Sequence, residues 1–151
     1  MGDVVDHVLT VTDKFTQFAA GRTDAPRGQR RRPVDRRAAL SATILESRAA
    51  WSSVDPVRVC HLPFGDFQAH EAAAINCADV LLHAWDVARG TGLEHSIPAE
   101  LVPQALATIQ RLASDEAVRD GHYARPPTEV RGATADMLLI ASGRSPTWPD
   151  R

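Results

Sequence analysis

The sequence predicts an all-α protein, a single helical bundle domain over residues 1–151 with minor short strands. Along most of the chain, apolar residues recur every three or four positions, which is the period of an amphipathic helix. One stretch, from about Asp66 to Gly90, runs without proline or internal glycine and is long enough for a helix of several turns. A chain of 151 residues has the length of one ordinary domain and can bury a core.

The first helix is expected over about residues 4–20. Asp3 is suited to cap its N-terminus, and Gly21 is suited to close its C-terminus. Its apolar positions are Val4, Val8, Val11, Phe15 and Phe18. Residues 22–33, RTDAPRGQRRRP, should then form an exposed loop, because glycine, prolines and clustered arginines disfavour regular structure there.

A second helix is expected to follow Asp35 and to end before Pro56. It carries four large apolar side chains: Leu40, Ile44, Leu45 and Trp51. Residues 57–61, VRVCH, alternate apolar and polar side chains and include β-branched valines, so they predict a short strand before the turn at residues 63–66.

Two further helices are expected after the long one. Ser96 as cap and Pro98 just inside the first turn predict a helix that continues through Leu112. The segment ATADMLLIASG predicts a last short helix, which Gly143 would stop, and residues 145–151 are expected to form a tail.

The composition excludes some classes of partner. A net charge of −2 predicts no general affinity for nucleic acid or for anionic membranes. No apolar stretch approaches the roughly 20 residues that span a bilayer, and no basic segment followed by an apolar run marks a signal peptide. Cys60 and Cys77 lack the paired spacing of zinc or redox motifs, so they are expected to be free thiols in a reducing, cytoplasmic environment.

A row of polar side chains lies on the long expected helix. Asn76, Asp79, His83 and Asp86 follow one another at intervals of three and four, directly beside an apolar row that includes Leu82 and Trp85. A carboxylate and an imidazole inside a bundle are unfavourable unless they are paired or bound to a cation. A divalent metal ion would satisfy them.

Two ligands on one helix require a third from another helix, and His7 is the candidate. The alternative is a His–Asp hydrogen bond that needs no metal, and the spacing alone leaves both interpretations open. Cys77 points away from this row and is expected to be a small buried core residue. Cys60 and His61 should face opposite sides of their strand.

Four segments together carry a resemblance to a known family. They are the VVDH stretch that ends at His7, LPFG at residues 62–65, DVLLHAWDVARGTG at residues 79–92 and ATADMLLIASGRSP at residues 133–146. In this combination the chain resembles the actinobacterial DinB-like superfamily. It is most similar to the metal-binding branch related to mycothiol-dependent maleylpyruvate isomerase, and the resemblance covers nearly the whole chain.

This resemblance implies a DinB-like bundle that holds a divalent metal ion, with zinc or nickel favoured. It implies His7, Asp79 and His83 as the ligands, and it gives Asp86 a supporting or structural role. Family members have a further helix before the one that carries the first histidine. The resemblance therefore leaves two expectations, a bundle that lacks its first helix or a homodimer in which a second copy covers the exposed faces. A substrate domain after residue 151 is not expected.

Three functions remain as hypotheses. The favoured one is a metal-dependent transferase or isomerase that uses a small thiol, mycothiol in actinobacteria, and a small electrophilic substrate. The second is a metal-binding bundle without catalysis, such as a sensor or stress protein. The third is a nucleic-acid-associated helical protein that uses Arg30, Arg31 and Arg32; the acidic net charge and the lack of interleaved aromatic residues oppose it.

Overall fold

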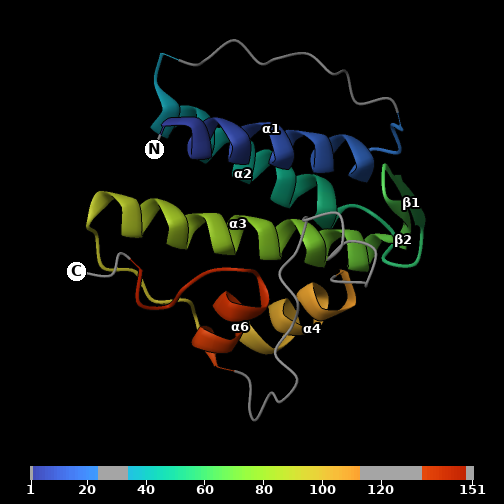
Figure 1. Ribbon diagram of the computed structural model, residues 1–151. Helices are drawn as coiled ribbons and strands as arrows, with labels where there is room; N and C mark the ends of the chain where they lie inside the picture. The colour runs from blue at the N-terminus through green and yellow to red at the C-terminus, as the bar shows by residue number, and fades with distance from the viewer. Residues whose placement is uncertain (1, 24–33, 113–133, 149–151) are drawn as a thin grey trace. The chain divides into compact units, whose positions relative to one another are not determined.

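The computed structural model describes residues 2–23, 34–112 and 134–148. This part of the chain is mostly helical, with one small antiparallel sheet (Figure 1). Its elements are α1 (Gly2–Ala19), α2 (Arg36–Ser52), β1 (Val59–Leu62), β2 (Gly65–Gln68), α3 (Ala69–Thr91), α4 (Val102–Leu112) and α6 (Ala135–Ala141). The prediction of an all-α fold with minor short strands is confirmed.

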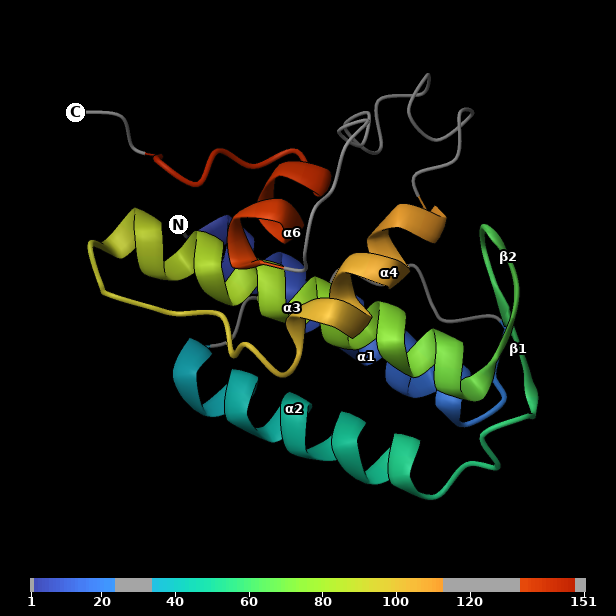
Figure 2. The same ribbon diagram turned by 90° about the horizontal axis from the view of Figure 1, so that it is seen from below.

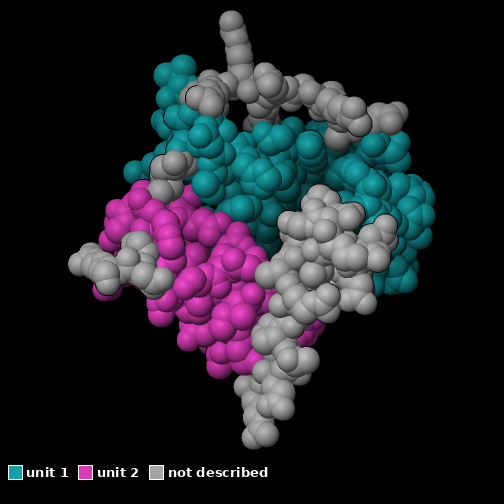
Figure 3. Space-filling model, in the orientation of Figure 1, with its two compact units in different colours: residues 1–83 teal, residues 84–151 magenta. Residues whose placement is uncertain are grey.

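The chain divides into two compact units, Met1–His83 and Ala84–Arg151, which Figure 3 shows in different colours. The first unit contains α1, α2, the hairpin and α3 as far as His83. The second contains the end of α3 together with α4 and α6. The prediction of a single domain stays a prediction.

Helix α1 begins earlier than the sequence indicates and ends where the sequence indicates. Because the helix starts at Gly2, Asp3 lies in its first turn and does not cap it, which corrects the prediction. At the other end, Gly21 adopts a φ of 79°. Its N–H donates to Phe18 O, and the Arg22 N–H donates to Gln17 O. This is the Schellman arrangement that glycine permits after a helix.

Helix α2 begins as predicted, and its fully buried side chains are polar. The Asp35 carboxylate accepts a hydrogen bond from Ala38 N at 3.0 Å and caps the N-terminus. The buried side chains of α2 are Thr43 and Ser47, whereas Leu45 stays 62% exposed. Small polar side chains therefore face the interior of the first unit. In Figures 1 and 2, α1 and α2 run alongside the first part of α3.

The hairpin replaces the first turn of the long predicted helix. β2 pairs with β1 in the register Cys60↔Phe67 and Leu62↔Gly65, so Asp66 is in a strand and α3 begins only at Ala69. The Glu71 carboxylate accepts a hydrogen bond from Gln68 N at 2.9 Å, which satisfies a backbone donor at the start of α3. The hairpin is also fastened to α1, because Arg58 Nη2 donates to the carbonyls of Phe18 and Ala19.

Helix α3 continues past Gly90 to Thr91 and is closed by Gly92, at a φ of 72°. The following helix also differs from the prediction, because α4 begins at Val102 and not near Ser96. Isolated turns precede it, in which Leu101 N donates to Pro98 O and Val102 N donates to Ala99 O.

Helix α6 agrees with the sequence at both ends. The Thr134 hydroxyl accepts a hydrogen bond from Met137 N at 3.3 Å, and Gly143 closes the helix at a φ of 81°. The predicted loop at 22–33 and the tail at 145–151 lie largely or partly outside the described residues. Within the described part, no helix is long and apolar enough to cross a membrane.

Each unit has its own apolar interior. In the first unit the large buried side chains are Val8, Leu9, Phe15, Phe18, Leu62, Ile75, Leu81 and Leu82. In the second unit they are Trp85, Ile97, Val102, Leu106, Ile109, Leu138 and Leu139. The predicted apolar positions of α1 thus contribute Val8, Phe15 and Phe18 to the core.

Candidate metal centre

The structure brings together the three side chains that the sequence singled out. His7 lies in the second turn of α1, and Asp79 and His83 lie one turn apart on α3, all within the first unit. Each offers one ligand atom, and these atoms all lie within 4.8 Å of one another. His7 is more than seventy positions away from the other two in sequence, so the fold itself creates this cluster.

The spacing within the cluster is close to that of a coordination sphere. His83 Nε2 lies 3.5 Å from Asp79 Oδ1, and the rings of His7 and His83 meet edge to face with centroids 4.8 Å apart. Nitrogen and oxygen ligands at about 2.0–2.2 Å from one ion lie roughly 3.0–3.5 Å apart when they are adjacent. The Asp79–His83 pair already has this separation, and His7 offers a ligand atom within 4.8 Å of both.

The cluster is partly exposed to solvent. The side chains of His83 and Asp79 are 19% and 28% exposed, whereas His7 is exposed. A site in this position has two partly buried ligands on one side and solvent access on the other.

The second carboxylate oxygen of Asp79 tests whether a cation fits here. Asp79 Oδ2 is buried and has no hydrogen-bond partner among the described residues. A buried carboxylate oxygen is costly unless a donor or a cation compensates it. The residues present therefore fit a divalent ion: two imidazoles and one carboxylate are a donor set that zinc and similar ions accept.

Buried polar side chains occur on all three helices of the first unit. They are Thr12 on α1, Thr43 and Ser47 on α2, and Asn76 on α3. Asn76 Nδ2 donates to Ser47 Oγ at 3.0 Å. Asn76 precedes Asp79 by three positions and lies on the same face of α3. The sequence singled out Asn76 but missed the other three, because hydroxyl side chains on an amphipathic helix give no distinctive pattern.

An ion pair lies directly beside His7. Arg36 Nε and Nη2 donate to the two carboxylate oxygens of Asp6 at 2.8 and 3.0 Å. This two-point contact joins the start of α2 to the second turn of α1. The hydrogen bond from Asp6 raises the pKa of Arg36 above its usual value, so the guanidinium stays charged. This pair could not be predicted, because nothing in the local spacing of the sequence connects Asp6 with Arg36.

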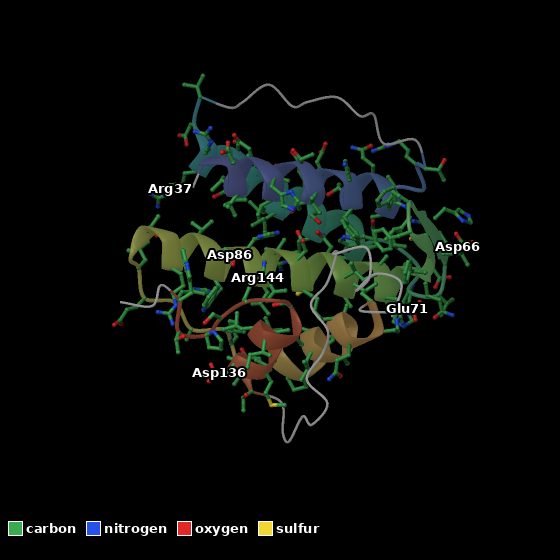
Figure 4. All side chains as sticks on the ribbon, viewed as in Figure 1. Arg37, Asp66, Glu71, Asp86, Asp136 and Arg144 are labelled. Carbon is green, nitrogen blue, oxygen red and sulfur yellow. The ribbon has the colours of Figure 1, made fainter. Side chains whose placement is uncertain are left out.

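Asp86, the last member of the polar row, has a structural partner in the second unit. Arg144 Nε and Nη2 donate to its two carboxylate oxygens at 2.8 and 2.7 Å. Figure 4 shows the two side chains next to each other. This pairing connects the end of α6 to α3 and agrees with the supporting or structural role expected of Asp86.

The two cysteines do not take part in the cluster. Both are free thiols, as predicted. Cys60 is buried and His61 is exposed, so the two face opposite sides of β1 as expected. Cys77 is exposed, which corrects the expectation of a buried core residue, because the side of α3 that carries it is not covered by the described residues. Partial desolvation nevertheless raises the pKa of the Cys77 thiol.

The remaining described histidines belong to the surface. His61 pairs with Asp66 across the hairpin at 2.7 Å, His70 Nδ1 lies 2.9 Å from Pro56 O, and His95 is exposed. Among residues 2–23, 34–112 and 134–148, the cluster of His7, Asp79 and His83 is thus the group suited to a metal ion. Arg30, Arg31 and Arg32, on which the nucleic-acid hypothesis rests, lie outside the described residues.

Comparison with known proteins gives relatives without a described activity. The chain is 25% identical over 148 residues to two uncharacterized proteins of Mycobacterium tuberculosis, MT0763 of strain CDC 1551 / Oshkosh and Rv0738 of strain ATCC 25618 / H37Rv. Each match covers 96% of this chain and 79% of the relative. No family model matches the chain, and no solved structure matches it. The chain is therefore similar, over nearly its whole length, to mycobacterial proteins of unassigned function.

Proposed function

We propose that the protein binds a divalent metal ion through His7, Asp79 and His83 and uses it as a thiol-dependent transferase or isomerase of the DinB-like superfamily. The observation that carries the proposal is the convergence of the three ligand atoms within 4.8 Å from two helices. Zinc and nickel are the proposed ions, because both accept imidazole nitrogen together with a carboxylate oxygen.

The thiol-dependent part of the proposal comes from the resemblance to mycothiol-dependent proteins, and the partial exposure of the cluster supports it. A bound divalent cation favours the thiolate over the thiol, and the thiolate is the nucleophile in isomerisation, conjugation and dehalogenation. Of the three proposed ligands, Asp79 and His83 are partly buried, whereas His7 is exposed. A small thiol and a small electrophile could approach from this open side. We propose a cytoplasmic location, where such thiols stay reduced.

The relatives from Mycobacterium tuberculosis support the choice of thiol. The chain is similar to mycobacterial, and thus actinobacterial, proteins over 96% of its length, and the resemblance gives mycothiol as the thiol in actinobacteria. We therefore propose mycothiol as the physiological thiol, and this part of the proposal rests on the resemblance described above and on the organism of the relatives.

The test uses cobalt(II), whose absorption reports its ligands. The apoprotein is titrated with Co²⁺, and N-acetyl-L-cysteine is then added to the loaded protein. We expect visible absorption bands from bound cobalt and, after the thiol is added, a new sulfur-to-cobalt charge-transfer band in the near ultraviolet. S-methyl-N-acetylcysteine, which cannot form a thiolate, is the control and should give no such band.

The outcomes separate the parts of the proposal. Cobalt bands without a thiol-dependent band would refute thiol chemistry and leave a metal-binding protein without catalysis. No cobalt bands, in wild type as in His83→Ala, would refute the metal site itself. Turnover would then be measured only with a protein that shows both signals, by following loss of thiol in the presence of small electrophiles such as 1-chloro-2,4-dinitrobenzene.

A further inference from the structure

Helix α2 supplies none of the three proposed ligands, yet it contacts both helices that do. Arg36, at its first turn, forms the two-point contact with Asp6 on α1. Ser47, three turns later, accepts the hydrogen bond from Asn76 on α3. These contacts lie next to the ligands along the chain, because Asp6 precedes His7 directly and Asn76 lies one turn before Asp79.

Two hydrogen bonds fix the geometry of the contact between Arg36 and Asp6. Two of the three guanidinium nitrogens, Nε and Nη2, each donate to a different carboxylate oxygen, and the Asp6 side chain is only 21% exposed. Paired N–H donors of this kind fix orientation as well as distance, which a single ion pair does not. The Asp6 backbone is thereby held against the start of α2, and the peptide that follows it belongs to His7.

The second contact of α2, between Ser47 and Asn76, lies in the protein interior. Both side chains are buried, at 4% and 5% exposure, and their hydrogen bond is 3.0 Å long. A buried amide whose donor loses its partner is unfavourable, so this contact resists sliding of α3 against α2. Asn76, Asp79 and His83 lie on one face of α3, so a shift at Asn76 moves both ligands together.

The two contacts are far enough apart to control alignment. Arg36 and Ser47 are eleven residues apart, which corresponds to about 16 Å along the axis of a helix. Two fixed points at this separation hold α2 in both position and direction. The distance between His7 on α1 and the pair of ligands on α3 then depends on α2, although α2 touches no metal.

We propose that Arg36 and Ser47 are positioning residues that set the separation of His7 from Asp79 and His83 and so determine the metal affinity of the site. This inference rests on the proposed metal site. Residues that orient metal ligands from outside the coordination sphere typically change metal affinity by about 10–100-fold when they are replaced. We expect values near the lower limit here, because both residues act through the backbone.

The test measures the zinc dissociation constant of the full chain by competition with a chromophoric chelator. The variants are Arg36→Ala and Ser47→Ala, and each has a matched control on the same helix. Arg37→Ala is the control for Arg36→Ala and removes an exposed neighbouring arginine; Figure 4 labels Arg37 at the start of α2. Ser41→Ala is the control for Ser47→Ala and removes an exposed serine. We expect both test variants to bind zinc about tenfold more weakly, and both controls to bind like wild type.

A second comparison separates positioning from general loss of stability. In the His7→Ala background the ligand that Arg36 places is gone, so Arg36→Ala should cause no further loss of affinity. A loss of similar size in both backgrounds would overturn the inference. Arg36→Lys keeps the charge but not the paired geometry, and it should lie between wild type and Arg36→Ala in affinity at unchanged helical content.

The failure of this inference differs from the failure of the proposed function. If wild type binds no zinc, the metal site is refuted. If wild type binds zinc and the test variants match their controls, the site stands and α2 has no part in setting its affinity. If Ser47→Ala loses its helical circular dichroism, Arg36→Ala and Arg36→Lys decide the question on their own.

Discussion

At the scale of single residues, the buried oxygen of Asp79 connects stability with function. Asp79 Oδ2 has no hydrogen-bond partner among the described residues, and His83 lies 3.5 Å from the other oxygen. A buried charge in this state costs free energy in the metal-free protein. Once a cation binds, its attraction to this carboxylate stabilises the protein. Asp79 should therefore lower the stability of the metal-free protein and be necessary for metal binding.

Asp79→Asn should change both the thermal stability of the metal-free protein and its response to zinc. The metal-free variant should unfold at a temperature equal to or above that of metal-free wild type, because the uncompensated charge is removed. Zinc should raise the melting temperature of wild type and leave that of the variant unchanged. The measurement is thermal unfolding by circular dichroism with chelator and with zinc. A variant that is strongly destabilised without metal would contradict this reading of the carboxylate.

The thiols give a second prediction at this scale. Cys77 is exposed and Cys60 is 3% exposed, so iodoacetamide should modify one thiol per native chain and two after denaturation. Modification of Cys77 should need a higher pH than modification of an unperturbed thiol, since its raised pKa lowers the thiolate fraction. Mass spectrometry of the intact chain gives the count. Cys77→Ser should show no modification in the native state.

Some residues of the candidate site could be predicted from the sequence and others could not. The interval between Asp79 and His83 is local, so the sequence alone predicted that they share a helix face. His7 required a contact between two helices, and only the resemblance to DinB-like proteins favoured it. Arg36, Ser47 and Thr12 could not be predicted, because their importance arises from packing between helices and not from any periodicity.

At the scale of elements, glycine position decides how each helix ends. Gly90 lies inside α3, whereas Gly92 follows it at a φ of 72°. Gly90→Ala should stabilise the protein by about 0.5–1 kcal/mol, because alanine loses less backbone entropy in a helix. Gly92→Ala should destabilise it by about 1–2 kcal/mol, because a side chain disfavours this left-handed conformation.

Denaturant unfolding of the two variants checks this pair of predictions. Both glycines are exposed and are two positions apart, so differences in burial do not separate them. Changes of the same sign in both variants would contradict the assigned end of α3. The sequence placed this end at Gly90, because it contains both glycines and gives no sign of which one adopts the positive φ.

The ion pair of the second unit is also an element-scale feature, since it joins α6 to α3. The side chains of Arg144 and Asp86 are only 19% and 25% exposed, and two hydrogen bonds connect them. A double-mutant cycle of Asp86→Asn and Arg144→Gln should give a coupling free energy of about 1–2 kcal/mol. A coupling near zero would show that the pair does not hold the helix end.

The hairpin and α2 show why element boundaries were partly mispredicted. Asp66, Phe67 and Gln68 suit a helix by local pattern, but pairing with β1 places them in a strand. In α2, the sequence pointed to four large apolar side chains, yet the buried ones are Thr43 and Ser47, which lie on the same face as Leu40 and Trp51. In both cases a contact with another element overrides the local preference.

At the scale of the whole molecule, the helical class was predictable because it depends on hydrophobic period and chain length. The division into two compact units was not, since α3 passes through the boundary without any change in composition. The cluster of His7, Asp79 and His83 lies entirely in the first unit, and the Asp86–Arg144 pair lies in the second. Variants of the pair should therefore leave metal affinity close to that of wild type, even where they lower stability.

The central claim is that the folded chain holds one divalent ion on His7, Asp79 and His83. The most direct measurement is the metal content of tag-free protein by elemental mass spectrometry, for wild type, His7→Ala and His83→Ala, with exposed His95→Ala as control. We predict near-stoichiometric zinc or nickel in wild type and His95→Ala, and a large loss in the other two. Equal metal content in all four proteins, or none in any after reconstitution with zinc and nickel, would contradict the claim.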